Sequence, residues 1–191
     1  SLKRARNPMS SSRRRAAGKK AKRKGNNFER RVAKMLEEWW GSEFHRTPMS
    51  GGSQLAAGFD FAGDVVTNDP TFPFHVEAKN QEGWHVAQVF VSDGCKPFKF
   101  WDQACSEAPD SRIPLVIMTR NHHPIWGIVS YDTFEVLKGT NVSHHVNHMD
   151  VVRSDGEHLV IFLITELFIT APDIWKGSVS RESENSGSSS D

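Results

Sequence analysis

Two carboxylates and a lysine, carried on two short predicted strands, are the residues of this sequence best suited to chemistry. Asp64 begins one short apolar run, and Glu77 and Lys79 lie in a second, Phe74–Lys79. The stretch 68–73 between them is rich in Asn, Asp and Pro, which favour turns, so we expect two neighbouring antiparallel strands. Side chains alternate along a strand, which puts Glu77 and Lys79 on one face and allows Asp64 to lie beside Glu77.

Grouped carboxylates of this kind bind a hard cation such as Mg²⁺, which prefers oxygen ligands. A bound metal lowers the pKa of its water, and a lysine beside it can orient that water. The alternative is a solvated strand face that carries one ion pair. Glu-x-Lys is too short a motif to exclude that alternative, so the wider sequence has to decide.

Charge is distributed very unevenly along the chain. Residues 1–25 hold 11 of the 24 Lys and Arg residues and no acid, whereas the remainder holds 13 basic and 23 acidic residues, a net charge of −10. We expect a basic arm over 1–25, disordered when free, and a disordered Ser/Gly/acidic tail over 176–191. A nucleic-acid arm is favoured over a purely solubilising one. Its expected DNA contacts include Arg13, Arg14, Arg15, Lys19 and Lys20.

Cysteine usage points to a reducing compartment, and hydropathy predicts no membrane span. Cys95 and Cys105 make neither a disulfide framework nor a zinc site, and no apolar run approaches the roughly 20 residues of a membrane span. The basic beginning of the sequence lacks the apolar segment of a secretory signal. We expect a cytoplasmic or nucleoid-associated protein, nuclear or organellar in a eukaryote, and not a secreted one.

The first half of the body predicts a helix, a strand and a glycine-rich loop. A helix is expected from about Asn26 to Gly41, because apolar residues recur at helical spacing. A short strand carrying Arg46 follows, and then a loop containing Ser50 and Ser53, which could also be a simple connector. The apolar stripe of the helix consists of Phe28, Val32, Met35, Leu36, Trp39 and Trp40.

The second half predicts further elements of both kinds. Trp84 to Val91 fits either a helix or a strand, and a helix is expected from about Lys96 to Pro109. Ile113–Met118 and Ile125–Val129 predict strands, Tyr131–Leu137 a short helix, and 151–164 a hairpin.

This order of elements and motifs resembles the PD-(D/E)xK nuclease superfamily, and most closely the archaeal-type and phage Holliday-junction resolvases. The shared features are Phe28-Glu29-Arg30, a strand with Arg46, the Ser/Gly loop, Gly63-Asp64 and Glu77-Ala78-Lys79. The resemblance covers roughly residues 25–130. It implies an α/β fold with a restriction-endonuclease-like α-β-β-β-α-β core and a mixed central sheet. A nuclease domain over 26–175, with its core at about 26–130, would carry a β-rich carboxy-terminal extension. The connection after Lys79 is longer than this family pattern leads us to expect.

The resemblance also implies roles for individual residues. Glu29, Asp64, Glu77 and Lys79 would be catalytic, and Mg²⁺, with Mn²⁺ as a substitute, would be held by Glu29, Asp64, Glu77 and the backbone carbonyl of Ala78. Lys79 would position the attacking water. The residues implied to contact DNA are Arg30, Arg46, Ser50 and Ser53. Gln103, on the helix after the lysine, could support the site or simply face solvent.

The function implied is that of a metal-dependent DNA endonuclease, structure-specific for branched DNA such as a Holliday junction. Paired cuts in a two-fold-symmetric junction imply a homodimer. Two alternatives remain open. One is a restriction-like or repair nuclease of the same superfamily acting on duplex DNA, and the other is a non-catalytic DNA-binding protein that uses the basic arm.

Overall fold

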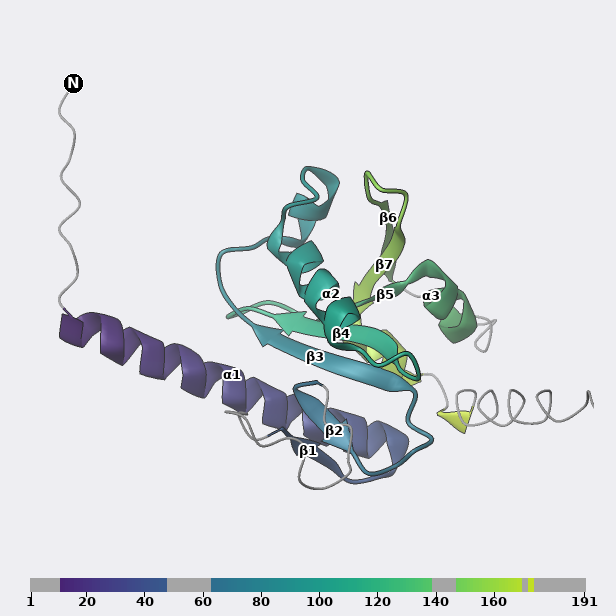
Figure 1. The fold of residues 1–191 in the computed structure, drawn as a ribbon, viewed down its shortest axis with the longest axis horizontal. Coiled ribbons are helices and arrows are strands. Elements are labelled where there is room, and N and C mark those ends of the chain that lie inside the picture. The colour runs from purple at the N-terminus through teal and green to yellow at the C-terminus, as the bar shows by residue number, and fades with distance from the viewer. Residues whose placement is uncertain (1–10, 48–62, 139–146, 170–171, 174–191) are drawn as a thin grey trace, which may run out of the picture.

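The computed structural model describes residues 11–47, 63–138, 147–169 and 172–173. Within these ranges seven strands form one mixed sheet in the order β1-β2-β3-β4-β5-β7-β6, with helices on both faces (Figure 1). In chain order the elements are α1 (Ser11–Trp40), β1 (Phe44–Arg46), β2 (Val65–Thr67), β3 (Phe74–Asn80), the 3₁₀ helix η1 (Val86–Phe90), α2 (Lys96–Glu107), β4 (Ile113–Thr119), β5 (Trp126–Ser130), α3 (Tyr131–Lys138), β6 (His148–Val152), β7 (His158–Leu163) and α4 (Ile164–Ile169).

Helix α1 is longer than the sequence predicts. It begins at Ser11 instead of near Asn26, so the prediction of disorder is wrong for residues 11–25. Ala, Lys and Arg are strong helix formers, and a helix already nucleated by its packed half extends into such a segment at little cost. The predicted apolar stripe is confirmed, and Gly41 ends the helix in the left-handed region at φ 86°. None of the described helices is both long and apolar enough to cross a membrane.

The sheet combines antiparallel and parallel pairs. β1, β2 and β3 are successively antiparallel, and β3 pairs in parallel with β4, which places Glu77 beside Val116 and Lys79 beside Met118. α2 lies in the connection between the two parallel strands, as such a crossover requires. The order α1-β1-β2-β3-α2-β4 therefore confirms the predicted α-β-β-β-α-β core.

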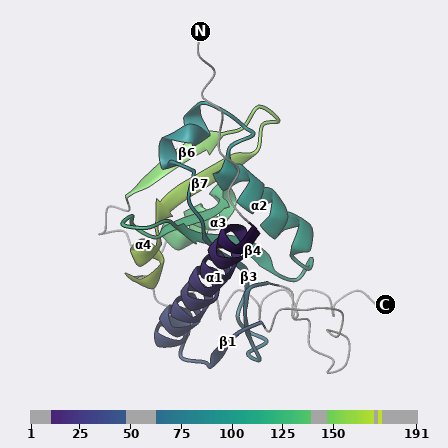
Figure 2. The same ribbon diagram turned by 90° about the vertical axis from the view of Figure 1, so that its left-hand side faces the viewer.

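Two apolar cores lie on opposite faces of this sheet. α1 covers one face and α2 the other, with β3 and β4 between them (Figures 1 and 2). Alternation along β4 shows the division clearly, since Leu115 and Ile117 join the core under α1, while Val116 and Met118 join the core under α2. The central strands are thus buried on both faces, and their polar side chains lie in a region with little solvent.

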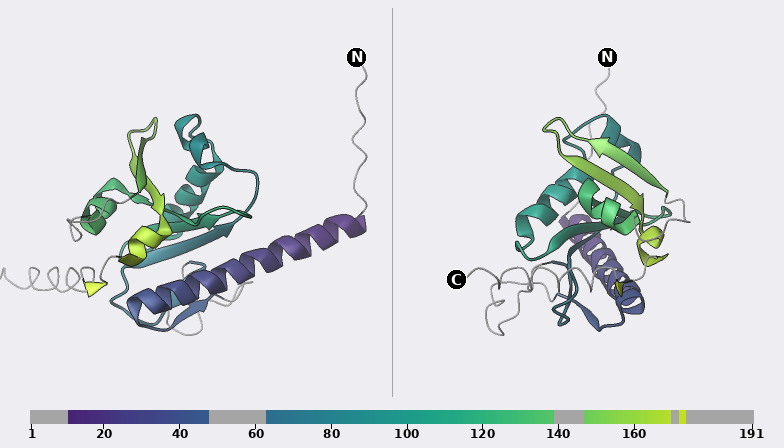
Figure 3. Two further views of the ribbon diagram at one scale, coloured as in Figure 1. Left: turned by 180° about the vertical axis from the view of Figure 1, so that it is seen from behind. Right: turned by 90° about the vertical axis from the view of Figure 1, so that its right-hand side faces the viewer.

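The connection after β3 adds to the α2 side, whereas the carboxy-terminal extension adds apolar residues to both cores. The ambiguous stretch around Trp84–Val91 contains η1, capped by His85 and Gln88, and it packs Trp84 and Val89 under α2. β6 and β7 form the predicted hairpin and extend the sheet at the end far from β1 (Figure 3). The β-rich extension is therefore continuous with the core sheet.

Candidate active site

Asp64 is held opposite Glu77 by the pairing of β2 with β3. Val65 lies opposite Val76 in this antiparallel register, so the residue before Val65 falls opposite the residue after Val76. The Asp64 N–H donates to the Val76 carbonyl at 3.0 Å, and the Ala78 N–H donates to Asp64 Oδ2 at 3.0 Å. These two bonds fix both the backbone and the carboxylate of Asp64 at the edge of β3.

The backbone conformation at position 63 requires the glycine that precedes Asp64. The φ of Gly63 is 110°, and a Cβ at this position would lie 2.9 Å from the Val76 carbonyl oxygen and 3.4 Å from the His75 ring. Only glycine adopts such a backbone at no steric cost. The Gly63 carbonyl also accepts a hydrogen bond from Thr47 Oγ1 at 2.7 Å, which ties the start of β2 to the end of β1.

The ammonium of Lys79 lies between the two carboxylates. Its Nζ donates a hydrogen bond to Glu77 Oε1 and lies 3.7 Å from Asp64 Oδ2. The side chain of Glu77 is 2% exposed, that of Lys79 14% and that of Asp64 30%. The group is therefore closed at Glu77 and opens to solvent at Asp64.

Burial changes the protonation of this group. Burial, reinforced by the nearby charge of Asp64, raises the pKa of Glu77 to about 7, although the hydrogen bond from Lys79 opposes the shift. Burial alone would lower the pKa of Lys79, but its bond to Glu77 and the charge of Asp64 raise it instead. Lys79 therefore stays charged, and Glu77 is the group whose charge the site disfavours.

Glu29 and Arg46 form a second ion pair beside these residues. Arg46 Nε lies 3.5 Å from Glu29 Oε2, and both side chains are less than a fifth exposed. Burial raises the pKa of Glu29, and the charge of Asp64 raises it further, while Arg46 and Lys79 act in the opposite direction. Glu29 thus belongs to the same electrostatic cluster as Asp64 and Lys79.

These residues fit a divalent cation. Three carboxylates face two cationic side chains in the cluster, which leaves an excess of negative charge. Burial and then the charge of Asp64 raise the pKa of Glu77, and a bound cation would offset both effects. In a strand the N–H and C=O of a residue point to the same edge, so the Ala78 carbonyl faces the Asp64 side and can add an oxygen ligand.

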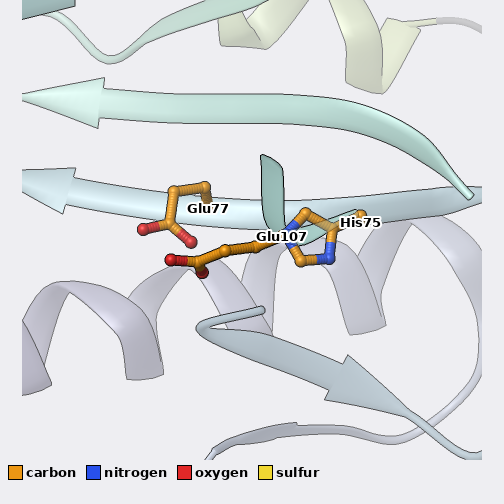
Figure 4. A group of neighbouring side chains, drawn as sticks. All are labelled: His75, Glu77 and Glu107. Carbon is orange, nitrogen blue, oxygen red and sulfur yellow. The ribbon is translucent and has the colours of Figure 1, made fainter. Parts of the chain in front are cut away.

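Glu107 and His75 are neighbours of this cluster that sequence reasoning missed. One ligand atom each of His75, Glu77 and Glu107 lies within 4.8 Å of the others, and the Glu107 carboxylate lies beside that of Glu77 (Figure 4). His75 could have been found, because it precedes Glu77 by two residues on the same strand face. Glu107 comes from the end of α2, and only the packing of α2 brings it here. Gln103 Nε2 donates to Glu107 Oε1 at 3.0 Å, so the predicted support residue reaches Glu77 through Glu107.

The other predicted site residues lie on α1 or outside the described residues. Arg15, Lys19 and Lys20 are exposed on α1, and Arg30 is exposed with its guanidinium bonded to Asn27 Oδ1 at 3.1 Å. Ser50 and Ser53 lie outside the described ranges, as do the side chains of Arg13 and Arg14. Their predicted contacts with DNA stay predictions.

Comparison with known proteins identifies the family. Residues 20–175 match the model of the family described as "Phage putative PDDEXK endonuclease". No curated protein and no solved structure matched the chain. The matched range includes the β1–β4 core, the Asp64–Lys79 cluster and the carboxy-terminal hairpin, so the core is restriction-endonuclease-like. Because the match extends over most of the chain, the protein belongs to the phage PDDEXK endonuclease family.

Proposed function

We propose that this protein is a Mg²⁺-dependent DNA endonuclease whose active site is the cluster of Glu29, Asp64, Glu77 and Lys79. One observation carries the proposal: a lysine ammonium contacts two carboxylates from paired strands, and one of these carboxylates is buried with a raised pKa. A solvated strand face would leave Glu77 exposed and would have no reason to bury it. The family match supports the nuclease activity itself.

Asp64, Glu77 and the Ala78 carbonyl would hold the metal, with Glu29 joining directly or through water. Such a metal polarises the scissile phosphodiester and lowers the pKa of a nucleophilic water. A bound cation would offset the cost of the Glu77 charge and would favour the ionised carboxylate. The Lys79 ammonium donates to Glu77 and lies 3.7 Å from Asp64 Oδ2 on the open side, where it can orient the attacking water.

Glu107 is a competing ligand for the same cation. It lies beside Glu77, and with His75 it offers an alternative set of donors. We favour the Asp64 side, because the Ala78 N–H fixes the Asp64 carboxylate, whereas Glu107 is exposed at a helix end. Gln103 would restrain Glu107 and so support the site indirectly.

For the substrate we propose branched DNA, with a homodimer that makes two symmetric cuts in a Holliday junction. Support comes from the resemblance of the Glu29, Arg46 and Asp64 segments to the junction resolvases. Arg46 is the cation next to Glu29 in the cluster, so it can meet a phosphate that reaches the metal ligands.

A cleavage assay tests the activity and the substrate separately. The full chain is incubated with labelled four-way junction and with linear duplex of the same sequence, in Mg²⁺, in Mn²⁺ and in EDTA. We expect cleavage only with metal, with the junction cut faster and in symmetric pairs. Equal cleavage of duplex would indicate a restriction-like or repair nuclease, and binding without cleavage in either metal would indicate a non-catalytic DNA-binding protein.

A further inference from the structure

We propose that DNA reaches the active site along a second, basic surface, which we call the basic cleft. It lies between the middle of α1 and the turn that follows β4. The cations that line it are Lys20, Arg23, Lys24 and Arg31 from α1 and Arg120 from the turn. The proposal is that the cleft holds the sugar–phosphate backbone of a DNA strand. It rests on the proposed nuclease function and names the surface by which that nuclease holds its substrate.

Shape and charge both support a phosphate ligand. The cleft has a volume of about 640 Å³, and no acidic residue is among the described residues that line it. On α1, positions 20, 24, 27 and 31 are three or four residues apart, so they share one face of the helix. Four cations on α1 and one from the turn therefore point into one concave surface, although the body of the protein is acidic overall.

This concentration of positive charge is only partly neutralised within the protein. Lys24 forms an ion pair with Glu82, whose carboxylate also accepts from the Asn121 N–H at 3.0 Å. In the described part of the chain no ion pair neutralises Lys20, Arg23 or Arg31. Like charges that line one cleft repel one another, and the negative charge of a polyanion relieves that repulsion. A nucleic acid also releases its own counterions on binding, which favours association.

The cleft also offers neutral hydrogen-bonding groups. Asn27, Asn80, Thr119 and Asn121 lie between the cations. Asn80 lines the cleft, and its buried Oδ1 accepts no hydrogen bond from the described residues. A cleft of cations interspersed with amides suits a nucleotide chain, which can enter it. A membrane presents a broad surface of headgroups, which a broad basic patch fits better than a cleft does.

Position along β3 connects the cleft to the active site. Asn80 lines the cleft and directly follows Lys79 at the carboxyl end of β3. Neighbouring strand residues point to opposite faces, so the cleft and the carboxylate cluster lie on the two sides of one strand end. A DNA strand that passes around this end of β3 can contact both surfaces. Lys20, Arg23 and Lys24 lie in the predicted nucleic-acid arm, whereas Arg31 and Arg120 lie outside it.

A triple variant, Arg23→Ala/Arg31→Ala/Arg120→Ala, tests the proposal in the full chain. Binding to a labelled DNA duplex and a labelled junction is measured in EDTA over a range of salt concentrations, so that no cleavage occurs. We expect the Kd to rise at least tenfold, and the slope of log K against log salt to lose about 2–3, since each neutralised phosphate contributes roughly 0.9. The matching Arg→Lys triple variant should bind nearly as the parent does.

Lys20→Ala and Lys34→Ala form a matched pair of single variants. Both lysines are exposed on α1, but Lys20 lines the cleft and Lys34 does not. Lys20→Ala should weaken binding and Lys34→Ala should not, with melting temperatures unchanged in both. These single variants also serve if the triple variant fails to fold.

The two proposals fail in distinguishable ways. Parental binding and salt slope in the triple variant would overturn the cleft as the DNA surface, even if the parent cleaves DNA. Loss of binding in the triple variant would support the cleft even if the parent proves inactive in every metal. Equal losses in Lys20→Ala and Lys34→Ala would show a general effect of charge and would also overturn the cleft.

Discussion

Lys79 Nζ lies 3.7 Å from Asp64 Oδ2, across the boundary between β2 and β3. The same ammonium is bonded to Glu77, which is almost fully buried. One cation therefore links a carboxylate of β3 with the carboxylate that directly precedes β2. This relationship distinguishes the cluster from a surface ion pair, and it determines what each substitution should do.

Lys79→Ala should reduce cleavage by more than a hundredfold while leaving metal binding measurable. The substitution removes the cation but none of the oxygen ligands. A lysine that only neutralised a surface carboxylate would contribute about 0–1 kcal/mol, which corresponds to a loss of less than about tenfold. Single-turnover cleavage and Mn²⁺ titration of the same preparation separate the two effects. A loss below tenfold would favour the surface interpretation.

Asp64→Asn and Glu77→Gln should each reduce cleavage by about a thousandfold or more and preserve DNA binding. Each change removes one charged ligand and nearly keeps its shape, and a bound metal supplies several kcal/mol of transition-state stabilisation. Cleavage and binding are measured on the same junction. Asp110→Asn is the matched control, because Asp110 is an exposed acid in the turn that follows α2. Near-parental turnover in either variant would contradict the assignment of the site.

The raised pKa of Glu77 makes the metal-free protein less stable as the pH rises. Its folded-state pKa is about 7, against an ordinary value of 4.5, so the folded state binds more protons than the unfolded state between these values. The free energy of unfolding must then fall as the pH rises through this window, and the full loss is present above pH 7. A shift of this size corresponds to a contribution on the order of 1–3 kcal/mol.

Glu77→Gln should therefore gain stability relative to the parent between pH 5 and pH 8. Urea unfolding in EDTA, at several pH values, measures this difference. The lost contact with Lys79 adds an offset that is constant in this range, because the pKa of Lys79 lies far above it. Parallel curves for the two proteins would mean that Glu77 is ionised throughout. Metal should stabilise the parent more at pH 8 than at pH 5.

Gly63→Ala should displace Asp64 and impair cleavage more than its effect on folding would suggest. A Cβ at 2.9 Å from the Val76 carbonyl forces β2 away from β3, and the positive φ adds strain, together about 1–3 kcal/mol. Gly18→Ala is the control, since Gly18 lies in α1 with open space around it and should become slightly more stable. Thermal unfolding and cleavage rates of the two variants provide the comparison. Full activity in Gly63→Ala would show that Asp64 tolerates displacement.

Much of the cluster was predictable because strand geometry is local. Alternation along β3 and an antiparallel partner were sufficient to place Asp64 opposite Glu77, whereas Glu29 was expected in the site only from the resemblance to the junction resolvases. Glu107 could not be predicted in the same way, because its position depends on how α2 packs on the parallel pair β3–β4. A crossover helix carries no local signal for the residue that its last turn will approach.

The basic cleft shows a second limit of the sequence. Arg120 is about ninety residues from the cations of α1, and the parallel register of β4 on β3 brings its turn beside the helix. The sequence also underestimates the length of α1, because the like charges of residues 11–25 indicate disorder while their helix propensity favours the helix that forms. Both features depend on contacts between distant parts of the chain, which a pattern of hydropathy and charge does not contain.

Deleting residues 1–24 should weaken DNA binding strongly and flatten its salt dependence. The deletion removes 11 positive charges, leaves a body of net charge −10, and takes Lys20, Arg23 and Lys24 from the basic cleft. The slope of log K against log salt should fall by roughly 3–6, since only part of the removed charge contacts phosphate at any time. A full-length variant with Gln at these 11 positions should lose binding equally while keeping the chain length.

Folding should tolerate this deletion, because the buried stripe of α1 begins only at Phe28. The described side chains before Gly25 are largely exposed, and the Lys24–Glu82 ion pair that is lost is a surface contact worth about 0–1 kcal/mol. The melting temperature should therefore barely move. Preference for the junction should survive at low salt if it resides in the folded body. The phosphate contacts of the arm add affinity but do not themselves distinguish one DNA from another. Equal salt slopes for the deletion and the parent would assign the arm to targeting or solubility, and DNA would then have to bind a face of the acidic body.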